Sequence, residues 1–178
     1  MYWLWMVTGL WIAVWLQAAA GTMRIALPLI VVAAFYYAVP AGRARAALVA
    51  LPAAGLLDAL LVDRALTCTL TAGGAILIAD FWRRHGDTRL WFAQAVPGAV
   101  LGLGTAAVTL VLQYLGQGLP VPGQWLENLR YLVWMSLAGL VLLPAAALLL
   151  DACAERLHVQ RYQDTRRHLN GFDHEAYP

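Results

Sequence analysis

Asp58 is a carboxylate among small and apolar residues in the stretch AAGLLDALLVDRAL at residues 53–66, where the next charges are Asp63 and Arg64. Away from water, an ionised carboxylate needs hydrogen-bond donors or a paired charge. The other polar residues inside apolar runs are Gln17, Asp80, Gln94, Gln113 and a few Thr. Asp80 lies three and four residues before Arg83 and Arg84, so we expect a structural ion pair there. This set is too thin for membrane catalysis or an ion relay.

The cysteines and histidines give no metal or redox pattern. We expect Cys68 and Cys153 near opposite membrane faces, whereas a disulfide needs α-carbons about 6 Å apart. Three of the four His lie near the C-terminus, with spacings of ten and six that do not share a helix face. The sequence has no phosphate-binding glycine loop, HExxH pair or nucleophile elbow. We therefore expect no enzyme, no metal and no cofactor.

The composition is typical of an integral membrane protein. Of 178 residues, 62% are hydrophobic and 12% are charged, against roughly 25% charged in a typical soluble domain. Six apolar runs follow one another, at about 2–20, 25–41, 46–62, 65–82, 90–116 and 129–152. A spanning helix needs about 20 such residues. The expected fold is an all-α polytopic bundle of about six transmembrane helices over residues 1–155, with a short tail at 156–178. The third and fourth runs are so close that five spans remain an alternative.

The arginines set the expected orientation. All twelve basic residues are Arg. If the six spans alternate in direction, the loops after the second and fourth spans lie on the same side as the tail. Nine Arg fall on that side and three on the other. Connections rich in Arg stay in the cytoplasm. Both termini, and the tail, are therefore expected to be cytoplasmic.

Small residues predict close helix packing. Gly98, Gly102 and Ala106 are four residues apart, a spacing that lets two backbones approach closely. A second stripe of small residues precedes Asp58 on the same expected helix face. It consists of Ala47, Ala50 and Ala54, and Gly55 lies next to it. We interpret Asp58, Gly55, Gly98 and Gly102 as positions that pack the bundle or a partner helix.

For Asp58, two interpretations stay open. In the first, the carboxylate accepts a charge-assisted hydrogen bond, from Gln17, from Thr67 or from a partner protein, and does no acid–base chemistry. In the second, it is a carboxylate that water reaches near the outer membrane interface. Lipid-facing placement is costly, which favours an inward or partner-facing side chain.

The order of these features resembles the bacterial rod shape-determining MreD family. The resemblance rests on WLQ at 15–17, RIALPLIVVAAFYYAVP at 24–40, AALVALPAAGLLDALL at 46–61 and RLWFAQAV at 89–96, and it covers about residues 15 to 155. It implies a multi-pass protein of the bacterial inner membrane with a non-enzymatic, scaffolding role in the cell-elongation machinery that makes peptidoglycan. The implied partners are a bitopic MreC-like periplasmic protein, the actin-like MreB filament, and the SEDS glycosyltransferase with its transpeptidase.

A second function class is a small-molecule-binding component of an energy-coupling vitamin transporter, which the MreD fold resembles in outline. It would need a cavity open to the outside and lined by several polar or aromatic groups. The first class instead needs a groove for another protein's transmembrane helix. A membrane enzyme is the third and weakest class.

The arginine distribution gives the first prediction. Reporter fusions at residue 43 should report the cytoplasm, and fusions at residue 123 the periplasm, because nine of the twelve Arg then lie inside. A periplasmic signal at residue 43 would overturn the orientation.

Overall fold

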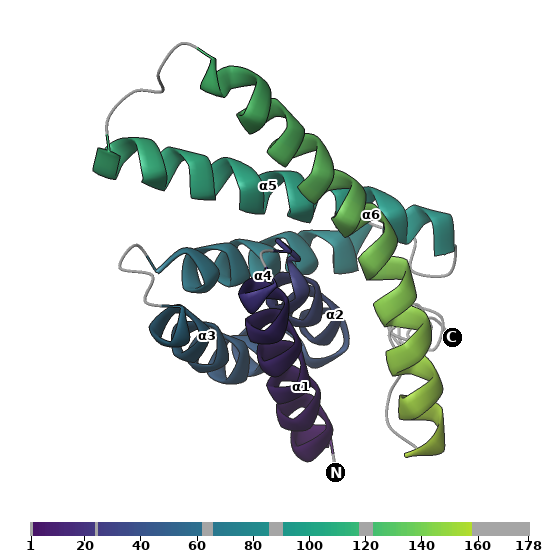
Figure 1. Cartoon of the computed structure of the whole chain (residues 1–178). Coiled ribbons are helices and arrows are strands. Elements are labelled where there is room, and N and C mark those ends of the chain that lie inside the picture. Colours follow the sequence, from purple (N-terminus) through teal and green to yellow (C-terminus); the bar gives the residue numbers. More distant parts are fainter. Residues whose placement is uncertain (1, 24, 62–65, 86–90, 118–122, 158–178) are drawn as a thin grey trace.

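The computed structural model describes residues 2–23, 25–61, 66–85, 91–117 and 123–157 (Figure 1). These residues form six helices: α1 (Tyr2–Thr22), α2 (Leu29–Ala41), α3 (Arg43–Leu60), α4 (Thr67–His85), α5 (Trp91–Gln117) and α6 (Gln124–Arg156). The described part of the chain contains no strand, so the predicted all-α class is confirmed. The tail expected at 156–178 lies outside the described residues after Leu157.

Three helical segments are long and apolar enough to cross a membrane: Tyr2–Thr22, Gln94–Gly116 and Gln124–Arg156. Their length and composition support a membrane protein. The second predicted run is shorter than expected, because the helix begins only at Leu29, after Pro28. Its 13 residues cover only about 20 Å at 1.5 Å per residue.

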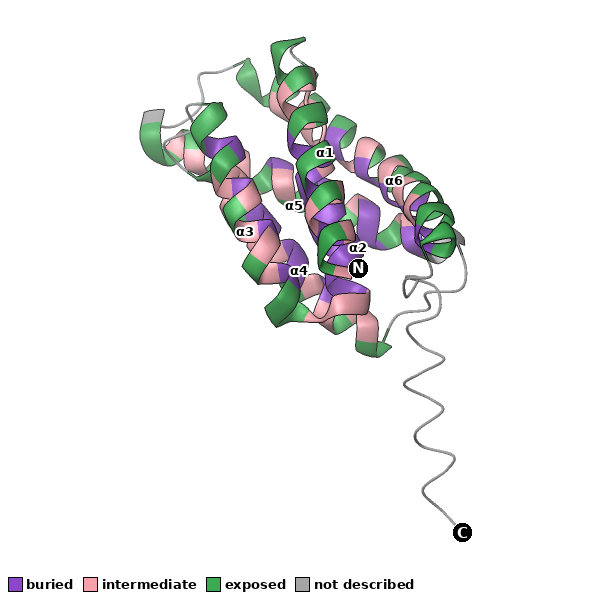
Figure 2. Cartoon of the chain, turned by 90° about the horizontal axis from the view of Figure 1, so that it is seen from below, coloured by how far each residue is buried: buried purple, intermediate pink, exposed green. Residues whose placement is uncertain are grey.

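The short helix α2 forms the centre of the bundle. Every residue from Ile30 to Val39 is buried, and α2 contacts all five of the other described helices. A helix that is apolar on every side belongs in a core. Figure 2 shows the buried positions on the faces that the helices turn toward one another.

A single residue, Gly42, joins α2 to α3. Its φ of 81° lies in the left-handed region that glycine adopts without strain. The Gly42 N–H donates to the carbonyl of Ala38 at 3.0 Å, and its carbonyl accepts from Ala46 at 3.1 Å. One residue therefore ends α2 and begins α3.

Helices α5 and α6 make the most extensive helix contact, and α6 crosses α5 in Figure 1. Their backbones meet at glycines. A β-carbon added to Gly98 would collide with the carbonyl oxygen of Gly139, and one added to Gly102 with that of Met135. The reverse also holds, because a β-carbon on Gly139 would collide with the carbonyl oxygen of Gly98.

The outer surface of the bundle is apolar. Leu4, Leu115 and Leu149 expose 74%, 79% and 70% of their surface, and many other large apolar residues are exposed on α1, α5 and α6. Soluble monomers rarely expose apolar patches so extensively. This surface is compatible with lipid around the helices.

The α5–α6 contact gives a stability prediction. Gly98→Ala and Gly102→Ala should each lower the free energy of unfolding by about 1–3 kcal/mol, because the added methyl group overpacks a backbone contact. Gly104→Ala is the matched control on the same helix, since a β-carbon there meets no atom within 4 Å. Unfolding in mixed detergent and SDS, followed by circular dichroism, measures the difference. Equal stability of all three variants would contradict the close approach.

Candidate functional site

Helix α4 begins after a residue that cannot cap it. Leu66 precedes the first helical residue and has a φ of 53°, while its carbonyl accepts from the N–H of Leu70 at 3.0 Å. Leu66 therefore occupies the N-cap position. A cap side chain normally accepts from the second or third helical N–H group, which leucine cannot do.

Asp58, near the end of α3, supplies the missing cap. One carboxylate oxygen accepts from the N–H of Cys68 at 2.8 Å, and the other accepts from the N–H of Thr69 at 2.9 Å and from its hydroxyl at 2.7 Å. These are the second and third N–H groups of α4. Asp58 is fully buried, and its negative charge lies at the positive end of the α4 dipole. The donors lie one and two residues beyond the Thr67 considered from the sequence.

Helix α2 is capped in the same manner. Pro28 stands at its N-cap and makes no side-chain cap. The amide oxygen of Gln17, on α1, accepts from the N–H of Ile30 at 2.7 Å. Ile30 is fully buried, so without Gln17 this donor would lose its partner away from water. Gln17 was considered as a donor to Asp58, but it acts as the cap of α2.

A contact between the two caps joins four helices. The amide nitrogen of Gln17 lies 3.9 Å from the sulfur of Cys68, to which it donates a weak hydrogen bond. Gln17, Ile30, Asp58, Cys68 and Thr69 form what we call the cap network. The network links the last part of α1 to the start of α2, and the last part of α3 to the start of α4. The contact between Gln17 and Cys68 joins these two pairs of helices.

The other residues selected from the sequence lie in two places. Gly55 is next to the cap network, where a β-carbon would lie 3.6 Å from the hydroxyl oxygen of Thr69. Gly98 and Gly102 lie in the α5–α6 contact instead. The expected ion pair of Asp80 is confirmed, because a carboxylate oxygen lies 3.0 Å from a guanidinium nitrogen of Arg84.

Sequence reasoning missed a second buried carboxylate, Asp151 on α6. It accepts a 2.6 Å hydrogen bond from the hydroxyl of Tyr36 on α2. The signal was present in the sequence, since Gly139, Leu143 and Ala147 precede Asp151 at steps of four and are buried like it. The Tyr36–Asp151 bond fastens α2 to α6.

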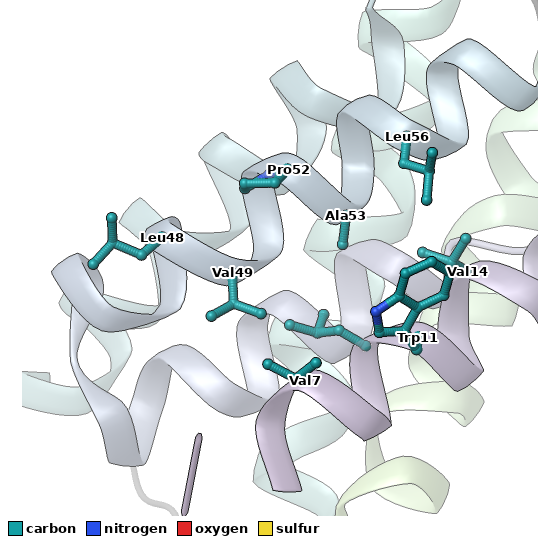
Figure 3. Close-up of a pocket in the computed structure, with 9 residues that line it drawn as sticks. Val7, Trp11, Val14, Leu48, Val49, Pro52, Ala53 and Leu56 are labelled. Carbon is teal, nitrogen blue, oxygen red and sulfur yellow. The ribbon is translucent and has the colours of Figure 1, made fainter. Parts of the chain in front are cut away.

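An apolar groove runs between α1 and α3 (Figure 3). Its volume is about 410 Å³, and it is lined by Val7, Leu10, Trp11, Val14, Leu48, Val49, Pro52, Ala53 and Leu56. Figure 3 shows Val7 and Trp11 on α1 facing Val49 and Ala53 on α3. The groove can accept an apolar helix or chain, and no lining side chain carries a charge.

A partly polar cavity of about 190 Å³ lies beside the cap network. Gln17, Thr67 and Cys68 line it together with Thr71, Thr105, Thr109 and Tyr131, and apolar residues complete its wall. Among the described residues, no group of three or more His, Cys, Asp or Glu is placed to bind a metal ion.

Comparisons with protein-family models, with curated proteins and with solved structures gave no match to this chain.

The cap geometry gives a graded prediction for Asp58. Asp58→Asn keeps one acceptor oxygen and should cost about 1 kcal/mol of unfolding free energy. Asp58→Leu leaves two backbone donors without an acceptor and should cost about 3 kcal/mol. Asp80→Asn is the control, because a partly exposed ion pair contributes about 0–1 kcal/mol. SDS unfolding measures all three variants, and wild-type stability of Asp58→Leu would show that the cap is dispensable.

Proposed function

We propose that the chain is a non-enzymatic scaffold of the bacterial cell-elongation complex in the inner membrane, as its resemblance to the MreD family implies. The observation that carries the proposal is the apolar groove between α1 and α3. In the proposed complex, this groove receives the single transmembrane helix of an MreC-like bitopic protein.

The groove has the dimensions of a helix-packing site. Its lining runs from Val7 to Val14 on α1 and from Leu48 to Leu56 on α3, which is about 10–12 Å, or two helical turns. Ala53 is the smallest lining residue, and small residues let a partner backbone come close. Trp11 offers a large ring against which partner side chains pack.

The cap network supports this role because it restrains both walls of the groove. Gln17 ties α1 to the start of α2, and Asp58 ties α3 to the start of α4. Since α2 and α3 are also joined by the single residue Gly42, the relative movement of the walls is limited. A groove that keeps its shape loses less conformational entropy when a helix binds.

The proposal includes six membrane passes with both termini in the cytoplasm. The first residues of α1 and the last of α6 both lie at the lower edge of the view in Figure 1, and an even number of passes would place both termini on one side. On the cytoplasmic side the chain would meet the MreB filament, and within the membrane the SEDS glycosyltransferase and its transpeptidase.

The second candidate is a small-molecule-binding component of a transporter. The partly polar cavity favours it, because its lining carries an amide, a thiol and several hydroxyl groups. Its volume of about 190 Å³ is below the range of about 300–1,000 Å³ typical of small-molecule sites. We therefore place the scaffold first.

The groove gives a direct test of the scaffold. Ala53→Phe should fill the groove and reduce co-purification with a co-expressed MreC-like partner at least tenfold, a loss of about 1.4 kcal/mol. Ala107→Phe is the matched control, because Ala107 is exposed on α5, away from the groove. Pull-down from detergent, normalised for membrane level, measures the effect. Undiminished capture by Ala53→Phe would exclude this groove as the docking site.

A further inference from the structure

Three arginines gather at the end of the bundle where α1 and α3 begin, opposite the cap network. Arg43 and Arg45 stand in the first turn of α3, and both are exposed. Arg83 lies in the last turn of α4. A guanidinium nitrogen of Arg83 lies 3.2 Å from the position of a β-carbon added to Gly42, the residue immediately before α3. The end of α4 therefore brings a third positive charge to the start of α3.

These three charges have no carboxylate partner in the described structure. The neighbouring Asp80 is paired with Arg84 at 3.0 Å. Within the described part of the chain, Arg43, Arg45 and Arg83 form no ion pair. The first turn of α3 contains no acidic residue, and the helix dipole is positive there as well, so cations at this place repel it. A bound anion would relieve this repulsion.

Aromatic residues at the same end of the bundle mark the level of lipid headgroups. Arg45 lies close enough to Tyr2, at the start of α1, to interact with it electrostatically. The Tyr2 hydroxyl is buried and has no hydrogen-bond partner among the described residues. Trp3 follows Tyr2 on α1, and Trp82 directly precedes Arg83 on α4. Tyrosine and tryptophan concentrate where a membrane meets water, which places the arginines beside phospholipid headgroups.

An exposed apolar surface continues from the arginines along α3 and α4. On α3, Leu48 follows Arg45 by three residues and exposes 70% of its surface. On α4, Phe81 and Leu77 precede Arg83 and expose 62% and 66% of theirs. The hydrocarbon chains of a lipid can cover such side chains while its headgroup stays with the arginines. A lipid therefore matches both parts of the surface, whereas a water-soluble phosphate matches the charges alone.

We propose that Arg43, Arg45 and Arg83 bind the headgroup of an anionic phospholipid, whose hydrocarbon chains lie along α3 and α4. Arginine suits this ligand because its planar guanidinium group donates two parallel hydrogen bonds to a phosphate. The Tyr2 hydroxyl is a further donor beside Arg45. The inference goes beyond the scaffold role and does not depend on it.

The charges of the site select a lipid with a net negative charge. A zwitterionic headgroup carries an ammonium group beside its phosphate, and that group needs a carboxylate or another acceptor. The carboxylate of Asp80 is already engaged by Arg84. Three cations without a described counter-charge therefore favour a headgroup that has a phosphate and no ammonium group.

The test measures binding of dioleoylphosphatidylglycerol to the purified full chain in a neutral detergent by native mass spectrometry. Dioleoylphosphatidylethanolamine has the same chains and phosphate but no net charge, and it should bind at least about fivefold more weakly. Glycerol 3-phosphate, which has the phosphate without the chains, should not displace the lipid. Equal binding of the two phospholipids, or displacement by glycerol 3-phosphate, would overturn the proposal.

Substitutions locate the lipid. Arg43→Gln, Arg45→Gln and Arg83→Gln should each weaken phosphatidylglycerol binding about fivefold, roughly the factor that one basic residue contributes near an anionic surface. The triple variant should lose the preference for phosphatidylglycerol over phosphatidylethanolamine. Arg130→Gln is the matched control, because it removes the same charge from α6, where Arg130 pairs with Glu127. Unchanged binding by the triple variant with wild-type helix content, or an equal loss in Arg130→Gln, would refute this site.

Discussion

The described structure depends on how the first N–H groups of α2 and α4 are satisfied in apolar surroundings. These groups have no partner within their own helix, and lipid offers none. Pro28 and Leu66 stand at the starts of α2 and α4, where a capping side chain would normally be, and neither makes a side-chain hydrogen bond. The caps come instead from the preceding helices, through Gln17 and Asp58. A helix is usually capped by a residue at its own start. Here the cap is a side chain of the preceding helix, so the capping hydrogen bonds also hold neighbouring helices together.

The same network explains how a helix of 13 residues can sit at the centre of much longer ones. Helix α2 cannot be positioned by the membrane, because it is shorter than the hydrocarbon core of about 30 Å. Its start is held by Gln17 on α1, and its later part by the hydrogen bond from Tyr36 to Asp151 on α6. Between these points its side chains are buried all round. The apolar groove lies between α1 and α3, two helices that both contact α2.

The sequence predicts some of these features and leaves others open. The helical class follows from the apolar runs, and a packed position for Asp58 follows from the small stripe before it. The buried stripe begins at Ala46 rather than at Ala47. The donors to Asp58 could not be predicted, since they depend on where α4 begins and on how the chain arrives there. Similarly, spacing identifies Gly98 as a close-packing residue, but only the crossing of α5 and α6 identifies Gly139 as the residue it meets. Asp151 follows buried residues at steps of four along α6, much as Asp58 follows the buried alanines of α3.

The position of the caps along the chain bears on how the protein is assembled during synthesis. Each acceptor precedes its donor: Gln17 comes 13 residues before Ile30, and Asp58 ten residues before Cys68. When the unsatisfied start of α2 or α4 leaves the ribosome, the group that satisfies it has already been made. The first four helices can therefore close pairwise, in chain order. The hydrogen bond from Tyr36 to Asp151 joins residues that are 115 positions apart. It can form only after α6 has been synthesised, later than the bonds made by Gln17 and Asp58.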